Sequence, residues 1–163
     1  MLLSQTELIA TLQKEIHILN HLCSKIEPAM LDYRPTPKQR STIELLRYLT
    51  MMGPVILPSV FAGKFLEDQW GAAEAKAATL DFPTIVTELA AQSAFYASSL
   101  EAASEDDLRA EIEMFGSTGS RTLHIINFLV CGHAAYRTQL FLYLKSCGRE
   151  ELGTMNLWAG VDA

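Results

Sequence analysis

The segment Arg121–Lys145, with the sequence RTLHIINFLVCGHAAYRTQLFLYLK, constrains the fold of this chain more than any other segment. It is strongly apolar, it contains no proline, and turn residues mark both of its ends. Ser120 is expected to cap its start through the side-chain hydroxyl, and Gly148 is expected to end it in a left-handed conformation. The segment therefore predicts one long buried helix with an unusual centre, which contains Gly132, His133, Tyr136, Arg137 and Gln139.

Three further segments carry apolar residues at the three- and four-residue spacing of an amphipathic helix. They are predicted at Gln5–Ile26 with Ser4 as N-cap, from Ser41 or Thr42 onward, and at Pro83–Ala103 with Asp81 as N-cap. Ser41 and Glu44 have the spacing of a capping box, in which hydroxyl and carboxylate each bind a free amide of the first turn. Pro54 and Pro58 interrupt the second pattern, so Met51–Ala62 is either a bent continuation or a short separate helix.

The segments between these helices are long and rich in turn residues or polar residues. They are Glu27–Arg40, Gly63–Leu80 and Ser104–Ser120. The run GAAEAKAA in the second has high helix propensity but little apolar periodicity, which predicts at most a short surface turn. The third predicts either a short helix over Glu105–Glu111 or a weakly paired strand over Leu108–Met114. We expect residues 1–163 to form a single all-α domain, a four-helix bundle with long connecting loops whose helices need not alternate in direction.

Composition narrows the possible functions. The formal net charge of −6 argues against a nucleic-acid partner, because phosphate binding needs a cationic surface. The three cysteines, Cys23, Cys131 and Cys147, show no short spacing, which is typical of a reducing compartment. The start does not resemble a signal peptide, and no run of ~18 apolar residues occurs, so we expect no membrane partner. These features together predict a cytoplasmic protein.

Arg137 is the residue of the central helix that most needs a partner, because an unpaired charge in an apolar environment is costly. Glu44 of the second helix and an anionic ligand are two candidate partners, and His133 lies one turn before Arg137 on the same side. A structural ion pair and a ligand-facing role are both open at this point. Another face of the helix consists of Cys131, Ala134, Ala135, Thr138 and Leu142. The small side chains on this face would let a second helix approach closely, inside the bundle or across a homodimer.

Three stretches resemble the DinB/YfiT-like superfamily, namely YRPTPKQRSTIELLRYL, HAAYRTQLFLYLKSCG and the terminal NLWAG. The resemblance implies a four-helix bundle and a metal-dependent hydrolase or thiol-transferase activity. It also implies three histidine ligands, one late in the second helix and two in an H-x-x-x-H-x-x-Q pattern of the last helix. When the glutamine is aligned, these three positions hold Tyr48, Gly132 and Tyr136. The neighbouring register places His133 and Arg137 there, and a guanidinium that stays protonated does not coordinate a metal.

We therefore predict a domain that has lost the histidine triad and holds no metal or other cofactor. A cleft at the same place is expected to bind a small polar or anionic molecule, with Glu44 as a further ligand-binding candidate; the residues expected to line it are Tyr48, His133, Tyr136, Arg137 and Gln139. Alternatively, the tyrosines fill the vacated site and hydrogen-bond to each other. The protein would act through this ligand or as a homodimeric interaction module. The alternative is a hydrolase or thiol transferase that holds Zn or Ni through non-standard ligands such as His133 and carboxylates. Metal-free catalysis with His133 as general base is a third hypothesis, so whether the protein is an enzyme is left open.

Overall fold

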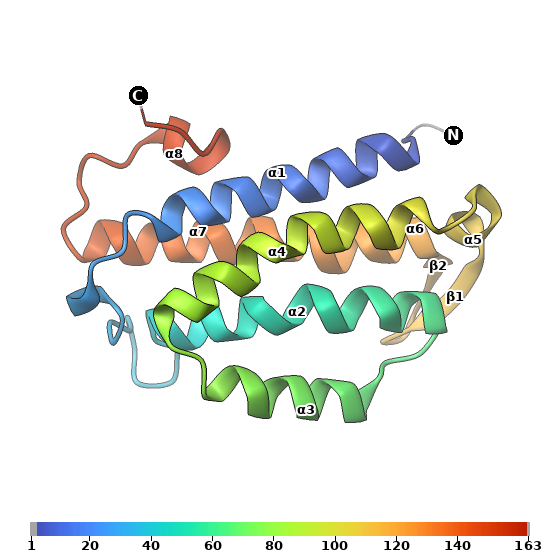
Figure 1. The fold of residues 1–163 in the computed structure, drawn as a ribbon, viewed down its shortest axis with the longest axis horizontal. Coiled ribbons are helices and arrows are strands. Elements are labelled where there is room, and N and C mark those ends of the chain that lie inside the picture. Colours follow the sequence, from blue (N-terminus) through green and yellow to red (C-terminus); the bar gives the residue numbers. More distant parts are fainter. Residues whose placement is uncertain (1–2, 163) are drawn as a thin grey trace.

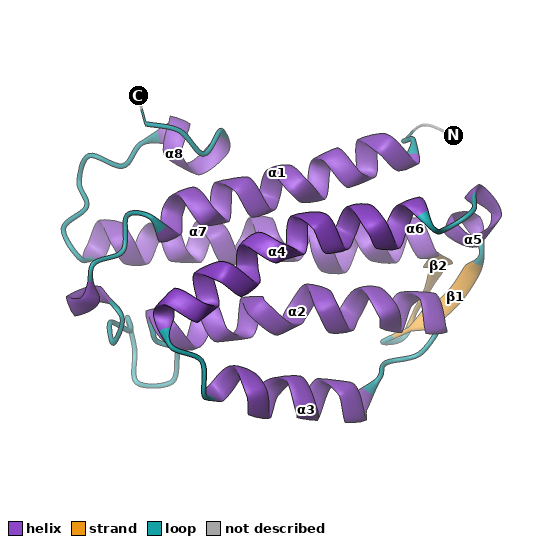
Figure 2. Ribbon diagram, viewed as in Figure 1, coloured by secondary structure: helices purple, strands orange, loops and turns teal. Residues whose placement is uncertain are grey.

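Four long helices form the body of the computed structural model, which describes residues 3–162 (Figure 1). They are α1 (Gln5–Cys23), α2 (Thr42–Ala62), α4 (Phe82–Glu101) and α7 (Cys131–Ser146). Helix α6 (Arg121–Ile125) and a π-helical turn (Ile126–Val130) lead directly into α7, so the predicted central helix is present over residues 121–146. The predicted all-α bundle is confirmed, and Figure 2 shows the two strands confined to a short hairpin at one end.

The remaining elements lie in the connections between the long helices, except for α8, which follows α7. They are a 3₁₀ turn (Pro28–Met30), α3 (Glu67–Ala78), α5 (Glu105–Arg109), β1 (Glu111–Met114), β2 (Ser117–Ser120) and α8 (Thr154–Trp158). A short helix and a strand were the two alternatives for residues 104–120. Each is confirmed in part, because helix α5 is followed by strand β1. The prediction of at most a short turn before α4 is wrong, since α3 spans 12 residues. Acidic residues in its first turn and Lys76 in its last favour the helix through its dipole, although its buried surface is small.

The direction of the helices follows from the position of α3. Helices α1 and α7 run one way along the bundle, and α2 and α4 run the other way (Figure 1). Helix α3 packs against α2 and carries the chain back to the end at which α2 began, so α4 can start there. The bundle therefore does not alternate in direction, and the returning helix forms an additional wall beside α2.

The ends of the long helices are set by the predicted side chains. The Ser41 hydroxyl accepts a hydrogen bond from the Glu44 backbone N–H, and the Glu44 carboxylate accepts one from the Ser41 N–H at 2.7 Å. The other predicted N-caps are also present, at Ser4, Asp81 and Ser120. Gly148 follows α7 with a φ of +97°, a left-handed conformation that favours glycine. These ends could be predicted because each depends on residues close together in the sequence.

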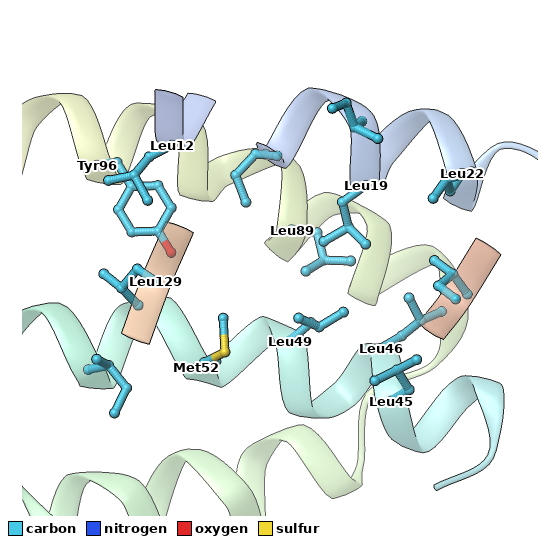
Figure 3. Close-up of a cluster of buried hydrophobic side chains, with 14 of the residues drawn as sticks. Leu12, Leu19, Leu22, Leu45, Leu46, Leu49, Met52, Leu89, Tyr96 and Leu129 are labelled. Carbon is cyan, nitrogen blue, oxygen red and sulfur yellow. The ribbon is translucent and has the colours of Figure 1, made fainter. Parts of the chain in front are cut away.

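Helix α2 is continuous through Pro54 and Pro58, so the interpretation of Met51–Ala62 as a separate short helix is wrong. By length and composition α2 could cross a membrane, although the sequence predicted no membrane-spanning segment. However, 67% of its most apolar window is buried inside the bundle, as expected for the core helix of a globular domain. Figure 3 shows side chains of α2 among leucines of α1 and α4 in this core, where those labelled from α2 are Leu45, Leu46, Leu49 and Met52.

The hairpin between α5 and α6 has a tight two-residue turn. Strands β1 and β2 pair antiparallel, with Met114 opposite Ser117. The turn residues Phe115 and Gly116 have φ values of +53° and +75°, so both adopt left-handed backbone. A turn of this shape joins twisted strands well and normally contains Asn-Gly or a similar pair. A phenylalanine at the first position is therefore an exception that requires a reason.

Candidate functional site

An aromatic cavity lies between α2, the start of α3, the hairpin tip and the central helix. Its volume is about 370 Å³, within the range of small-molecule sites. It is lined by Tyr48, Met52, Ile56, Phe65, Trp70, Phe115, Asn127, Phe128, Gly132 and Tyr136. Two of the predicted site residues, Tyr48 and Tyr136, meet here with ring centroids 5.0 Å apart.

Helices α2 and α3 supply two walls of the cavity. Tyr48, Met52 and Ile56 are four residues apart on α2, so they lie on one face of that helix. Phe65 and Trp70 flank the start of α3, with ring centroids 5.4 Å apart. The Trp70 ring also meets Tyr48 in an edge contact, with centroids 5.8 Å apart. Helix α3, which was not predicted, therefore brings an aromatic side chain to a predicted site residue.

The central helix supplies the opposite wall. Phe128, Gly132 and Tyr136 recur every four residues and face the cavity. Asn127 joins them from the π-helical turn, and turns of this kind inside α-helices are frequent at functional sites. A Cβ atom on Gly132 would lie 3.4 Å from the Met52 side chain. The glycine thus leaves the cavity open at the place where a larger residue would fill it.

Phe115 forms the edge of the cavity from the hairpin tip. Its ring centroid lies 5.3 Å from that of Phe65 and 5.4 Å from that of Phe128, yet the residue is 61% exposed. Its φ of +53° is unfavourable for a bulky side chain. Strained residues of this kind concentrate at functional sites. Phe115 is thus unfavourable for the conformation of this turn and is not buried in the core. Its ring instead borders the cavity.

The cavity is electrostatically neutral. None of its described lining residues carries a formal charge. Burial raises the pKa of the Tyr48 phenol and the neighbouring Tyr136 raises it further, whereas Arg40 opposes the shift. Tyr48 is therefore neutral near pH 7 and can donate or accept a hydrogen bond. With the Asn127 amide at the rim, the phenols place a few polar groups among apolar walls, as in most small-molecule sites.

Arg137 lies away from this cavity, in a structural ion pair. Its guanidinium binds both carboxylate oxygens of Glu15 on α1, with N–O distances of 2.5 and 3.4 Å. It also donates to the backbone carbonyl of Leu157 and lies 5.4 Å from the centroid of Trp158. Arg137 and Glu15 are only 5% and 7% exposed. Glu44, one of the two candidate partners, is not the partner of Arg137, and the interpretation of an ion pair that joins two helices is the one the geometry favours.

His133 lies in a second buried network, between α4 and α2. Its Nε2 atom is 2.7 Å from the Tyr96 hydroxyl, which is 3.2 Å from the Gln92 side-chain oxygen. The Gln92 amide donates to the Leu49 carbonyl at 2.8 Å. Burial lowers the pKa of His133 to about 4, so the ring is neutral at pH 7. Its side chain is 1% exposed and does not line the aromatic cavity, so the ring is enclosed by its protein partners.

The last two predicted site residues have local partners. The Gln139 amide donates to the Tyr143 hydroxyl at 2.5 Å, and that hydroxyl donates to the Arg40 carbonyl at 2.9 Å. Glu44 caps α2 and pairs with Arg34. The expectation that Tyr48, Tyr136, His133, Arg137 and Gln139 line one cleft is therefore wrong. The structure brings together two of them, Tyr48 and Tyr136, and separates the others.

Four aromatic residues of the cavity were missed as site residues, namely Phe65, Trp70, Phe115 and Phe128. Three of them lie in segments predicted to be connectors. A sequence signal for them did exist, because large aromatic side chains in a polar connector are expected to pack against other residues rather than remain in water. The signal does not say against what, so their meeting with Tyr48 and Tyr136 depends on tertiary structure.

Comparison with known proteins bears on the fold. No family model and no curated protein sequence matches the chain. Among solved structures, the crystal structure of the DinB-like protein YjoA from Bacillus subtilis is similar, with a TM-score of 0.68. The chain has a DinB-like fold. The two chains are 18% identical, and the match covers 91% of this chain and 96% of that one. The DinB resemblance expected from the sequence is thus confirmed for the fold.

The residues present do not fit the metal site that a DinB-like fold implies. In the register that aligns Gln139, the three positions that the resemblance assigns to ligands hold two phenols, of which Tyr48 is neutral, and a glycine that has no donor side chain. No cluster of three His, Cys, Asp or Glu side chains that could hold a metal ion occurs within residues 3–162. In the same part of the chain, no carboxylate lies within 4 Å of a His133 ring nitrogen. The set of His133 and carboxylates considered from the sequence therefore does not assemble.

Proposed function

We propose that this DinB-like protein binds a small, mainly apolar molecule in the aromatic cavity without a resident metal ion. The observation that carries the proposal is the position of the cavity. It lies where the fold implies metal ligands, and rings from separate segments converge on the space left by Gly132. The strained Phe115 supports the proposal, because an exposed ring with a φ of +53° contributes little to stability.

The proposed ligand site differs from the one expected from the sequence. Arg137 was the reason to expect an anionic ligand, but Glu15 neutralises it deep in the bundle. The proposal therefore rests on Tyr48, Tyr136 and the rings around them. These groups can stack on a flat apolar molecule and supply one or two hydrogen bonds to it.

Probe binding tests the proposal directly. The neutral fluorescent molecule N-phenylnaphthylamine should bind the protein saturably at one site. Trp70→Leu removes a cavity ring and should weaken this binding roughly tenfold, as expected for the loss of an aromatic contact. Trp158→Leu is the matched control, because it removes an exposed ring outside the cavity. Binding that is absent, or equally sensitive to both substitutions, would overturn the proposal.

Metal content tests the proposed absence of a resident metal ion, and with it the alternative of a metal-dependent enzyme. Protein purified without a metal-affinity tag should contain no stoichiometric Zn or Ni by elemental analysis. The triple variant Tyr48→His, Gly132→His and Tyr136→His should gain a metal, since it supplies three imidazoles at the expected positions. Stoichiometric metal in the wild type that disappears in His133→Ala would overturn the metal-free proposal and favour the metal-dependent hydrolase or transferase instead.

A homodimeric interaction module is the second candidate function. The observation in its favour is that the small-residue face of α7 lies at the surface, with Cys131 and Ala135 exposed and Leu142 57% exposed. A dimer across this face should sediment as such at micromolar concentration and dissociate in Leu142→Glu. A monomer at that concentration would remove this candidate. A cytoplasmic location is also part of the proposal, supported by three cysteines that are unpaired.

A further inference from the structure

A second cavity adjoins the aromatic one and shares Tyr48 with it. Its volume is about 340 Å³, and it is lined by Arg40, Glu44, Arg47, Tyr48, Met51, Glu74, Ala77 and Ala78. The two cavities differ in character, because the first has neutral apolar walls and the second carries charged side chains of both signs. Tyr48 forms a wall of both, so a molecule that passes the edge of this ring would contact an apolar and a charged environment.

Arg40 is the cation of the second cavity whose donors are available. Its guanidinium stacks over the Tyr48 ring, 4.2 Å from the centroid. Stacking uses the face of the guanidinium and leaves its five N–H donors in the plane. Within residues 3–162 the Arg40 side chain makes no hydrogen bond and no ion pair. By contrast, Arg47 donates to the Leu80 carbonyl through two nitrogens, and Arg34 is paired with Glu44.

We propose that the ligand of the aromatic cavity carries an acidic group, a carboxylate or sulfonate, which Arg40 binds beside Tyr48. This inference rests on the proposed function, because the apolar part of the ligand occupies the aromatic cavity. The stacked guanidinium is held in one orientation and offers paired donors, which match the two oxygens of such a group. The same positive charge disfavours a cationic ligand next to Tyr48, although exposed aromatic rings alone would favour one.

Glu74 limits the strength of this site. Its carboxylate lines the second cavity together with Arg40, and no ion pair engages it within residues 3–162. It would repel an acidic ligand, so its removal should strengthen binding. Removal of the Arg40 charge should therefore weaken the binding of an acidic ligand, and removal of the Glu74 charge should strengthen it. The affinity for a neutral ligand should not change in either variant.

Two probes that differ by one acidic group test the inference. Anilinonaphthalene sulfonate has the skeleton of N-phenylnaphthylamine with a sulfonate added. The wild type should bind the sulfonate more tightly than the neutral probe. Arg40→Gln should weaken sulfonate binding roughly fivefold, as expected for a charged contact near the surface, and should leave neutral binding unchanged. Glu74→Gln should strengthen sulfonate binding and also leave neutral binding unchanged.

Lys38→Gln is the matched control for Arg40→Gln. It changes the net charge equally and lies two residues away, but it lines neither cavity. An equal effect of the two substitutions on sulfonate binding would show long-range attraction only and would overturn the inference. Equal affinity of both probes with no effect of Arg40→Gln would overturn it too, while neutral binding that depends on Trp70 keeps the proposed function intact. If neither probe depends on Trp70, the proposed function itself fails.

Discussion

The two faces of α7 show how differently one helix can use residues at its centre. On one face, His133 and Arg137 are buried and their partners come from α4, α1 and α8. On the other face, Gly132 and Tyr136 border an aromatic cavity. Two residues that look functional in the sequence, His133 and Arg137, bind other helices of the bundle. Gly132 and Tyr136, four residues apart, instead line the cavity that we propose as a ligand site.

The largest predicted effect concerns the ion pair on the structural face. Arg137→Met leaves the Glu15 carboxylate buried without its partner, at 7% exposure. Loss of one member of a buried pair should reduce the free energy of unfolding by roughly 3 kcal/mol or more. Urea unfolding measures this quantity. The double variant Arg137→Met with Glu15→Leu should recover most of the loss, because no charge is then left unpaired.

If the double variant is as unstable as the single one, the pair is not the cause of the loss. If Arg137→Met is instead as stable as the wild type but loses affinity for the probes, the assignment of the two faces is reversed. The comparison therefore depends on measuring stability and probe binding for the same variants.

The next effect concerns the close packing around Tyr96. A Cβ atom at Gly53 would overlap the Tyr96 hydroxyl and lie 2.7 Å from the Gln92 side-chain oxygen. Gly53→Ala should therefore lower the free energy of unfolding by about 2 kcal/mol, since overpacking outweighs the gain in helix propensity. Gly71→Ala in α3 is the control, because nothing lies within 4 Å of that position. It should stabilise the protein by up to about 1 kcal/mol, and destabilisation at both sites would contradict the packing argument.

His133 should make stability depend on pH. Burial lowers its pKa to about 4 in the folded protein, against about 6.5 for an unfolded chain. Below pH 6.5 the unfolded chain binds a proton that the folded protein does not bind, so stability falls until about pH 4. The loss should be on the order of 2 kcal/mol. His133→Gln should flatten the difference between pH 6.5 and 4 in urea unfolding curves. Parallel curves for both proteins would show that His133 is not buried as described.

The smallest effect on stability is expected at the cavity edge. Phe115→Asn relieves the strained φ and loses two ring contacts, so the free energy of unfolding should stay within about 1 kcal/mol of the wild type. Affinity for N-phenylnaphthylamine should fall roughly fivefold through the lost aromatic contact. Leu142→Asn on the exposed face of α7 is the control and should leave affinity unchanged. A large loss of stability in Phe115→Asn would assign the ring to the fold rather than to the ligand.

Local chemistry explains which features could be predicted from the sequence. The caps at Ser41 and Ser120 and the left-handed Gly148 involve neighbouring residues, so their roles can be inferred without tertiary structure. Helix α3 was missed because its residues favour a helix but form no regular apolar stripe. The bundle itself is confirmed because four long periodic segments have few other ways to bury their apolar faces.

The candidate site could be predicted only in part. Tyr48 and Tyr136 were found because they occupy the ligand positions of a resembled family. The partner of Arg137 was missed because Glu15 lies 122 positions away and shares a helix with many other polar residues. The cavity as a whole depends on where the connectors fold back, and sequence spacing does not encode those contacts.

The two tryptophans of the chain allow the central claim to be tested in one experiment. Trp70 lines the aromatic cavity, and Trp158 lies over Arg137 on the structural side. Both indole N–H groups can be followed by NMR while N-phenylnaphthylamine is added to protein treated with a chelator. We predict a saturable shift of the Trp70 resonance with the Trp158 resonance unchanged. A shift confined to Trp158, no shift of either resonance, or a Trp70 shift that requires added metal would contradict a metal-free ligand site in the aromatic cavity.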